Sequence, residues 1–296
     1  MPRGQEVPQA ALITIDEAWR LRLWPFIDSL AVLVLSYPWL DYFHPDVCGS
    51  QLTRWLPIFK LMLKAAKSYS PHATVGVMMD YMSLPQMPRS ESETARFERS
   101  LHAMNEWYFH PFTVVLLVTT PPPDVDSHAY SNGRTYHERG WCNFEMNACL
   151  TIKNDQCLWD LSQMRDGVAE YGAHGYPAPP DTLVGLLKAG RSPPLSPPLF
   201  ASRLRAGVAG GTIRFTNADH DLVVDQFSRG FAIAWEGFKR NTLSAQPLWL
   251  GHLGWTDVDG AVLLDALRHA ARTWTFADAA DWASTASTAT APPPKS

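Results

Sequence analysis

The chain has 296 residues and a formal net charge of −4, with 46% hydrophobic and 18% charged residues. The apolar content is ample for a large buried core, and the charge excludes the strongly basic surface typical of nucleic-acid-binding proteins. The 4 cysteines form no Cys-x-x-Cys pair, which favours free thiols in a reducing compartment. The start lacks the pattern of a secretion signal, and the apolar run 30–35 is too short to cross a bilayer. We therefore expect a soluble cytoplasmic protein without a nucleic-acid or membrane partner.

The first half of the chain alternates helical and strand patterns. A capping-box spacing from Thr14 to Glu17 predicts an N-terminal helix within residues 1–28. Apolar runs of strand length then predict strands that are covered on both faces. They span residues 30–35, 74–79 and 113–118, and a shorter candidate spans 156–161.

Helical patterns separate these strands. One helix is expected to begin at Ser50, and another at Ser90, where Glu93 completes a capping box. The apolar face predicted for the first of them consists of Leu52, Trp55, Leu56, Phe59 and Leu63. The alternation predicts an α/β domain with a parallel sheet between helices, and right-handed crossovers place all carboxyl ends of the strands on one edge.

The second half of the chain is less regular. Its prolines predict an extended connection around one short helical turn. Thr216 or Asn217 is placed to cap a helix, and a strand over 248–253 and a helix over 261–272 follow. The predicted organisation is an N-terminal helix (1–28), an α/β domain (29–175), a proline-rich connection (176–211), a C-terminal part packing on the main domain (212–278) and a disordered tail (279–296).

Glu145 is the candidate functional residue that stands out. On a helix beginning near Arg139, Glu145 shares one side with Trp141 and Cys149, so a carboxylate falls in an apolar stripe. Burying an unpaired charge is costly, so something must hold Glu145 inward. The simpler alternative is that it satisfies backbone N–H groups or pairs with an arginine.

Polar and aromatic residues also follow the first two strands. Ser36, Tyr37, Trp39 and Asp46 come after the first strand, and Asp80 comes after the second. In open α/β sheets ligands bind at this edge, so these residues are expected to share one crevice with Trp141 and Glu145. Asp80 has two open interpretations, a catalytic carboxylate or a turn cap.

Several common sites are absent from the sequence. There is no GxGxxG, P-loop, HExxH or nucleophile-elbow motif. Asp124, Asp126, His128 and His137 cluster without the spacing of metal ligands, so no metal site is expected. Cys142 could be a nucleophile at a helix start, but no base lies near it in the sequence, which favours a structural thiol.

Three stretches resemble known families. The run Trp141-Cys142-Asn143-Phe144-Glu145 resembles the Trp-Cys-x-x-Glu helix of Toll/interleukin-1 receptor (TIR) domains. The runs 35–39 and 79–86 are similar to segments of the related fungal heterokaryon-incompatibility (HET) domain. The resemblance covers about residues 30–160, roughly half of the chain. Residues 248–271 further resemble a single leucine-rich-repeat unit, which needs neighbours to stack on.

The resemblance implies a flavodoxin-like sheet and, in enzymatic relatives, cleavage of the nicotinamide–ribose bond of NAD, which is a substrate and not a cofactor. It implies that Glu145 is the catalytic carboxylate and that self-association supports activity. The residues that it places at the nucleotide are Ser36, Tyr37, Trp39, Asp46, Asp80 and Trp141. The insert 121–137 departs from the pattern and could cover or obstruct the crevice.

Two other functions stay open. The first is a non-enzymatic, self-associating signalling scaffold, since many relatives are adaptors. The second is a nucleoside deoxyribosyltransferase with Glu145 as its nucleophile. A distinguishing feature is whether Glu145 faces an open crevice or is locked in an ion pair, for instance with Arg134 or Arg139.

Overall fold

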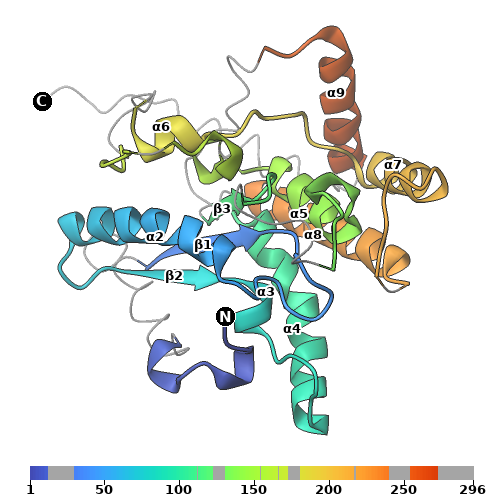
Figure 1. The fold of residues 1–296 in the computed structure, drawn as a ribbon. Coiled ribbons are helices and arrows are strands. Elements are labelled where there is room, and N and C mark those ends of the chain that lie inside the picture. The colour runs from blue at the N-terminus through green and yellow to red at the C-terminus, as the bar shows by residue number, and fades with distance from the viewer. Residues whose placement is uncertain are drawn as a thin grey trace, which may run out of the picture.

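The computed structural model describes residues 1–12, 30–111, 113–122, 131–153, 155–165, 167–172, 181–216, 218–239 and 254–272. In this part of the chain a parallel sheet of four strands lies between layers of helices (Figure 1). The strands are β1 (Leu30–Ser36), β2 (Thr74–Met78), β3 (Val114–Leu117) and β4 (Leu158–Asp160). The predicted parallel α/β sheet is confirmed, with small differences at the strand ends.

The strand order β2-β1-β3-β4 is that of the first four strands in a flavodoxin-like sheet. The chain leaves β1 toward β2 and then crosses over to β3 on the other side of β1. In register, Leu33 pairs with Val77 of β2 and with Val114 of β3. The carboxyl end of β1 is therefore the topological switch point, where α/β sheets of this kind bind ligands.

Alternate residues of β1 face opposite helix layers, as the pleat of a strand requires. Leu33 and Leu35 pack in the core under α2 (Ser50–Tyr69) and α6 (Leu183–Leu187). Val34 packs on the other face, in the core shared by α4 (Glu91–Phe109), α5 (Gly140–Leu150) and α8 (His220–Lys239). Ser36 lies two residues after Val34, so its side chain falls on the α5 side of the sheet.

The apolar face predicted for α2 is partly wrong. Trp55, Ile58 and Met62 are buried, whereas Leu56 and Leu63 are 41% and 37% exposed. Apolar residues occupy more of this helix than one layer of packing can cover. The stripe of α2 that begins at Trp55 packs against the sheet. When a helix has apolar residues on adjacent stripes, the sequence pattern does not show which stripe is buried.

The proline-rich connection also differs from the prediction, because it contains the helix α7 (Pro197–Ala209). Pro197 and Pro198 occupy the first turn, where a helix tolerates proline because the first N–H groups have no partner in the helix. The Ser196 hydroxyl caps this turn by accepting a hydrogen bond from the N–H of Leu199 at 3.3 Å. Prolines that predicted an extended chain therefore begin a helix.

The helix α9 (Asp257–Arg272) begins earlier than predicted, since the expected turn at 257–260 forms its first turn. Its Asp257 and Asp259 lie where the helix dipole favours acidic groups. The capping box at Ser90 is present, and the helix expected after Thr216 or Asn217 is α8, which begins at His220. The predicted helix from Thr14, the strand 248–253 and the tail 279–296 lie outside the described residues.

Short helical turns complete the described structure. They are η1 (Gly4–Glu6), η2 (Gln9–Ala11), α3 (Asp80–Ser83), η3 (Tyr136–Glu138), η4 (Asp155–Cys157) and η5 (Leu161–Gln163). In the described ranges, no helix combines the length and the apolar character that a membrane span requires.

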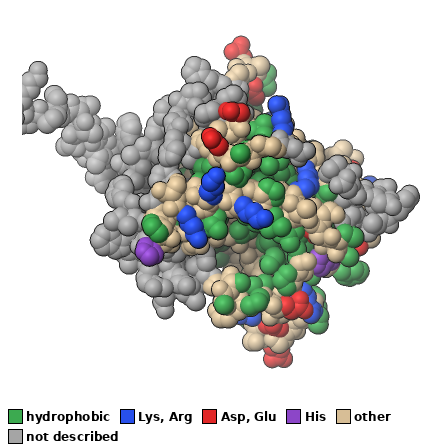
Figure 2. Space-filling view, turned by 60° about the vertical axis from the view of Figure 1, so that its left-hand side comes forward, with side chains coloured by type: hydrophobic (Ala, Val, Ile, Leu, Met, Phe, Trp, Pro, Cys, Tyr) green, Lys and Arg blue, Asp and Glu red, His purple; other side chains and the backbone are tan. Residues whose placement is uncertain are grey.

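The surface combines basic and apolar groups. Figure 2 shows one face of the molecule, on which Lys and Arg side chains gather among hydrophobic ones. Large exposed apolar side chains occur in the loops at Phe43 and Met87 and on α9 at Val258, Leu264 and Leu267.

Candidate active site

A pocket of about 390 Å³ lies at the carboxyl edge of the sheet. Tyr37 and Trp39 line it from the segment after β1, and Asp80 lines it from the start of α3 after β2. Trp141 and Glu145 line it from α5. Segments far apart in the sequence therefore meet around one hollow at the switch point of the sheet.

Glu145 lies in the wall of this pocket and is only 8% exposed. Its Oε2 accepts a hydrogen bond from Ser36 Oγ at 2.6 Å. Ser36 Oγ is also 2.6 Å from the hydroxyl of Tyr136. Ser36 does not line the pocket, so it holds the carboxyl group from the sheet.

Burial raises the pKa of Glu145 from an ordinary value of 4.5 to about 8. The hydrogen bond from Ser36 lowers this pKa, the charge of Asp80 raises it, and the Tyr108 hydroxyl lowers it. Glu145 is therefore mostly protonated at neutral pH, and a nearby positive charge would favour its ionised form.

No ion pair locks Glu145 among the residues that the structure describes. Arg139 instead donates hydrogen bonds from its guanidinium to the carbonyl oxygens of Asn132, at 3.2 Å, and Arg134, at 2.7 Å. The pairing that the sequence left open is therefore absent for Arg139. A backbone contact holds the start of α5, the helix that carries Glu145. The N–H of Gly140 donates a hydrogen bond to the Arg214 carbonyl at 3.0 Å.

Asp80 is a second carboxyl group in the pocket wall, and it is half-buried. Its Oδ2 accepts a hydrogen bond from Trp39 Nε1 at 2.9 Å, and its Oδ1 accepts one from the Tyr37 hydroxyl. Burial raises the pKa of Asp80, and these hydrogen bonds oppose the shift. Oδ1 also accepts a hydrogen bond from the N–H of Tyr81 at 2.7 Å, so Asp80 both begins a turn and faces the pocket.

Asp46, by contrast, does not line the pocket. Its buried carboxylate accepts hydrogen bonds from the N–H groups of Gln51, at 3.1 Å, and Leu52, at 2.9 Å. The first N–H groups of α2 need such acceptors, because the residue that precedes the helix is Gly49, which has no side chain. The structure thus places Asp46 at the start of α2 and not beside the other residues predicted for the site.

Trp141 links the pocket to the C-terminal half of the chain. Its Nε1 donates a hydrogen bond to Asp219 Oδ2 at 3.0 Å, just before α8 begins. The preceding residue is a glycine because the ring of Phe215 lies against it. A Cβ at Gly140 would come within 2.1 Å of that ring.

Several arginines line the pocket, and sequence reasoning named only two of them, Arg134 and Arg139, as possible ion-pair partners of Glu145. Those that line it are Arg89, Arg134, Arg139 and Arg214. Burial and the nearby charge of Arg134 both lower the pKa of Arg139. Arg89 stacks over the ring of Phe97, 3.4 Å from its centroid. Scattered single arginines gave no motif, and only the folded chain brings them together.

The described end of the insert 121–137 forms part of the pocket wall. Ser131 Oγ donates a hydrogen bond to Asp41 Oδ2 at 2.6 Å, and the N–H of Asn132 donates to the Leu40 carbonyl at 3.1 Å. These contacts attach the insert to the segment after β1. Asn132 and Arg134 then line the pocket themselves. Residues 123–130 of the insert lie outside the described ranges.

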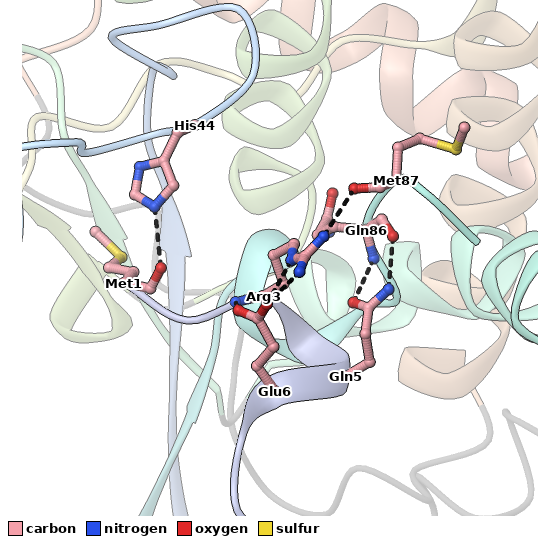
Figure 3. A network of polar contacts seen from close by, with 7 residues as sticks. All are labelled: Met1, Arg3, Gln5, Glu6, His44, Gln86 and Met87. Atoms are coloured by element: carbon pink, nitrogen blue, oxygen red, sulfur yellow. Dashed lines mark hydrogen bonds and ion pairs between the residues drawn. The ribbon is translucent and has the colours of Figure 1, made fainter.

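The N-terminal segment braces two of the loops at the pocket, as Figure 3 shows. The amide of Gln5 pairs with the backbone of Gln86, with Nε2 to O at 2.6 Å and N to Oε1 at 2.8 Å. His44 Nε2 donates to the carbonyl of Met1 at 2.9 Å. Gln86 Nε2 in turn donates to the Asp80 carbonyl at 3.1 Å. The first residues of the chain therefore connect the loops after β1 and β2.

No group of three or more His, Cys, Asp and Glu side chains within the described ranges is arranged to hold a metal ion. No protein-family model, no curated protein and no solved structure matches this chain. The function must therefore be inferred from the pocket itself.

Proposed function

We propose that this protein is a TIR-like NAD glycohydrolase, which cleaves the nicotinamide–ribose bond with Glu145 as its catalytic carboxylate. One observation carries the proposal. Glu145 is a buried carboxyl group in the wall of a pocket at the switch point of the sheet, and no described cation is paired with it. Titratable groups with strongly shifted pKa values in a cleft are typical of catalytic sites.

The charges around the pocket suit a dinucleotide with a positive ring and a negative diphosphate. The carboxyl group of Glu145 is buried and Asp80 is half-buried, whereas Arg134 is half-buried and Arg214 is exposed. A cationic nicotinamide ring near the carboxyl groups would leave the diphosphate within reach of the guanidinium groups. An uncharged nucleoside has no phosphate group that these arginines could bind, which disfavours the deoxyribosyltransferase alternative.

The chemistry requires one ionised carboxylate. Nicotinamide leaves as a neutral molecule when its bond to ribose breaks, so no acid has to protonate it. The ribose becomes an oxocarbenium-like cation, which an adjacent carboxylate stabilises. Water then adds to the anomeric carbon and releases a proton to the solvent. Because the pKa of Glu145 is about 8, kcat/KM is expected to rise with pH as this group ionises in the free enzyme.

The test compares NAD consumption by the wild type and Glu145→Gln, at low and high protein concentration because self-association is expected to support activity. Glu145→Gln keeps the shape of the side chain and removes its charge, so we expect at least a ~100-fold loss of turnover. Glu106→Gln, on the exposed side of α4, is the matched control and should keep full activity. Equal turnover by wild type and Glu145→Gln would reject the role of Glu145. A wild type that leaves NAD intact at both concentrations would reject the activity.

A non-enzymatic, self-associating scaffold is the second candidate. The exposed Leu264 and Leu267 favour it, because they lie three residues apart on one side of α9. A scaffold of this kind forms oligomers as its concentration rises and consumes no NAD. Sedimentation velocity over a concentration series, run beside the NAD assay, separates the two functions.

A further inference from the structure

Two buried hydroxyl groups form a chain that ends on Glu145. The Tyr136 hydroxyl lies 2.6 Å from Ser36 Oγ, and Ser36 Oγ lies 2.6 Å from Glu145 Oε2. Tyr136 is 1% exposed and Ser36 is fully buried, and neither lines the pocket. The chain therefore reaches the carboxyl group from the protein interior and not from the side where a substrate binds.

The proton count fixes the direction of this chain when Glu145 is ionised. Ser36 carries one hydroxyl proton, which it donates to the carboxylate. The Tyr136 hydroxyl must then donate to Ser36 Oγ, since that oxygen has no second proton to give. A hydroxyl that accepts a hydrogen bond becomes a better donor, so Tyr136 strengthens the bond from Ser36 to the anion.

Tyr136 is held firmly in place by the turn η3. The hydroxyl and the N–H of Thr135 donate to Glu138 Oε2 at 2.8 Å and 2.7 Å, which closes a capping box around the turn. The ring itself belongs to the core cluster that also contains Phe144 of α5. The position of the Tyr136 hydroxyl therefore depends on packing that does not involve Glu145.

Few groups support a negative charge on Glu145. The titratable groups that influence it or are influenced by it are Tyr37 after β1, Asp80 of α3, Tyr108 of α4, Tyr136 of η3 and Cys142 and Cys149 of α5. Burial raises the pKa of each of these tyrosines and cysteines, so they are neutral near pH 7. Asp80 opposes ionisation, and among the described residues Ser36 and Tyr108 lower the pKa of Glu145.

We propose that Tyr136 is a positioning residue, which acts through Ser36 to hold Glu145 Oε2 and to stabilise the ionised form of this carboxyl group. The proposal rests on the proposed function for its catalytic meaning, but it makes a claim about Glu145 that can be measured without turnover. It also gives a role to the insert 121–137, whose last residues supply this hydroxyl.

The experiment follows the carboxyl carbon of Glu145 by NMR through a pH titration of protein labelled with ¹³C-glutamate, with the signal assigned by its loss in Glu145→Gln. Ser36→Ala should move the titration midpoint upward by about one pH unit, because the anion loses a charge-assisted hydrogen bond. Tyr136→Phe, which removes only the hydroxyl, should move it upward by less. In the double variant, Tyr136→Phe should add nothing to the effect of Ser36→Ala.

Tyr171→Phe is the matched control, because Tyr171 packs against Trp159 in the core on the opposite face of the sheet. It should leave the titration unchanged. If Ser36→Ala does not fold, Ser36→Cys replaces it in the cycle, since a thiol is a weak donor. An unchanged midpoint in Tyr136→Phe, or equal shifts from Tyr136→Phe with and without Ser36, would overturn the proposal. These results do not depend on whether NAD is cleaved. If the protein does cleave NAD, the pH profile of kcat/KM should move upward with the same variants.

Discussion

The buried carboxyl group of Glu145 lowers the stability of the folded protein and is also the group proposed to act in catalysis. The folded protein holds its carboxyl group with a pKa of about 8, against an ordinary value of 4.5. Between these values the folded state keeps a proton that the unfolded chain releases. The stability of the protein therefore falls as pH rises through this window, because ionisation lowers the free energy of the unfolded chain while the folded state still holds the proton. A site that needs an ionised carboxylate has to accept this loss.

Glu145→Gln removes this pH dependence, because glutamine stays neutral. We expect the variant to gain stability relative to wild type as pH rises from about 5 to about 8, by up to about 1.4 kcal/mol per pH unit. Urea unfolding at several pH values measures the difference. Glu106→Gln, which changes an exposed carboxylate, should follow the wild type at every pH. Curves for wild type and Glu145→Gln that stay parallel would show that Glu145 is not protonated in the folded state.

The residues around Glu145 also show what a single sequence can predict about a site. Tyr37, Trp39 and Asp80 reach the pocket because they follow parallel strands, whose carboxyl ends share one edge. Asp46 follows the same strand but lies next to a helix start, and the unpaired N–H groups there bind it instead. The four arginines come from three separate segments, and no local pattern brings them together. The sequence pattern therefore predicted the pocket residues whose position follows from the sheet topology. It did not predict those whose position depends on tertiary packing.

At the scale of elements, the N-terminal segment acts as a brace for the pocket loops. Gly4 lies against the backbone of Leu84, where a Cβ would come within 2.2 Å of the carbonyl oxygen. The side-chain amide of Gln5 can then pair with Gln86 as a backbone amide would. The segment thus holds the loop that carries Asp80 at one end and Gln86 at the other.

Removing the Gln5 amide should loosen this loop. We expect Gln5→Ala to speed hydrogen exchange at the Gln86 N–H by about five- to tenfold, because that donor loses its acceptor. Exchange followed by NMR reports this amide directly. Gln9→Ala, at an exposed position of the same segment, is the control and should not change the rate. The brace has no mechanical role if both variants exchange at the wild-type rate.

The elements themselves were predictable where one pattern dominated. Uninterrupted apolar runs identified the strands, since a strand covered on both faces has few polar positions. The buried face of α2 was ambiguous because apolar residues surround much of that helix, and the sheet decides which of them are covered. The helix α7 was missed because its prolines suggest an extended chain, although at the first turn of a helix they are favourable. Residue propensities therefore gave a wrong prediction where the position of a residue within the helix matters more than its type.

At the scale of the whole molecule, the C-terminal helices complete the core that positions α5. Phe227 of α8 is fully buried and stacks on Phe200 of α7, with ring centroids 4.0 Å apart. The same ring meets Phe109 of α4 at 5.7 Å and Phe144 of α5 at 6.4 Å. One side chain therefore joins the C-terminal half to the two helices that cover the sheet beside the pocket.

This shared core predicts that both halves unfold together. Phe227→Ala should destabilise the protein by about 3–5 kcal/mol, because it leaves a cavity among four aromatic rings. Tryptophan fluorescence and circular dichroism should report a single transition at a lower urea concentration. Ile233→Ala, on the exposed side of the same helix, should change stability little. Two separate transitions, with the sheet keeping its wild-type midpoint, would mean that the C-terminal helices fold apart from the domain that holds Glu145. The single transition is expected because α8 packs on α5 itself, so loss of one removes the support of the other.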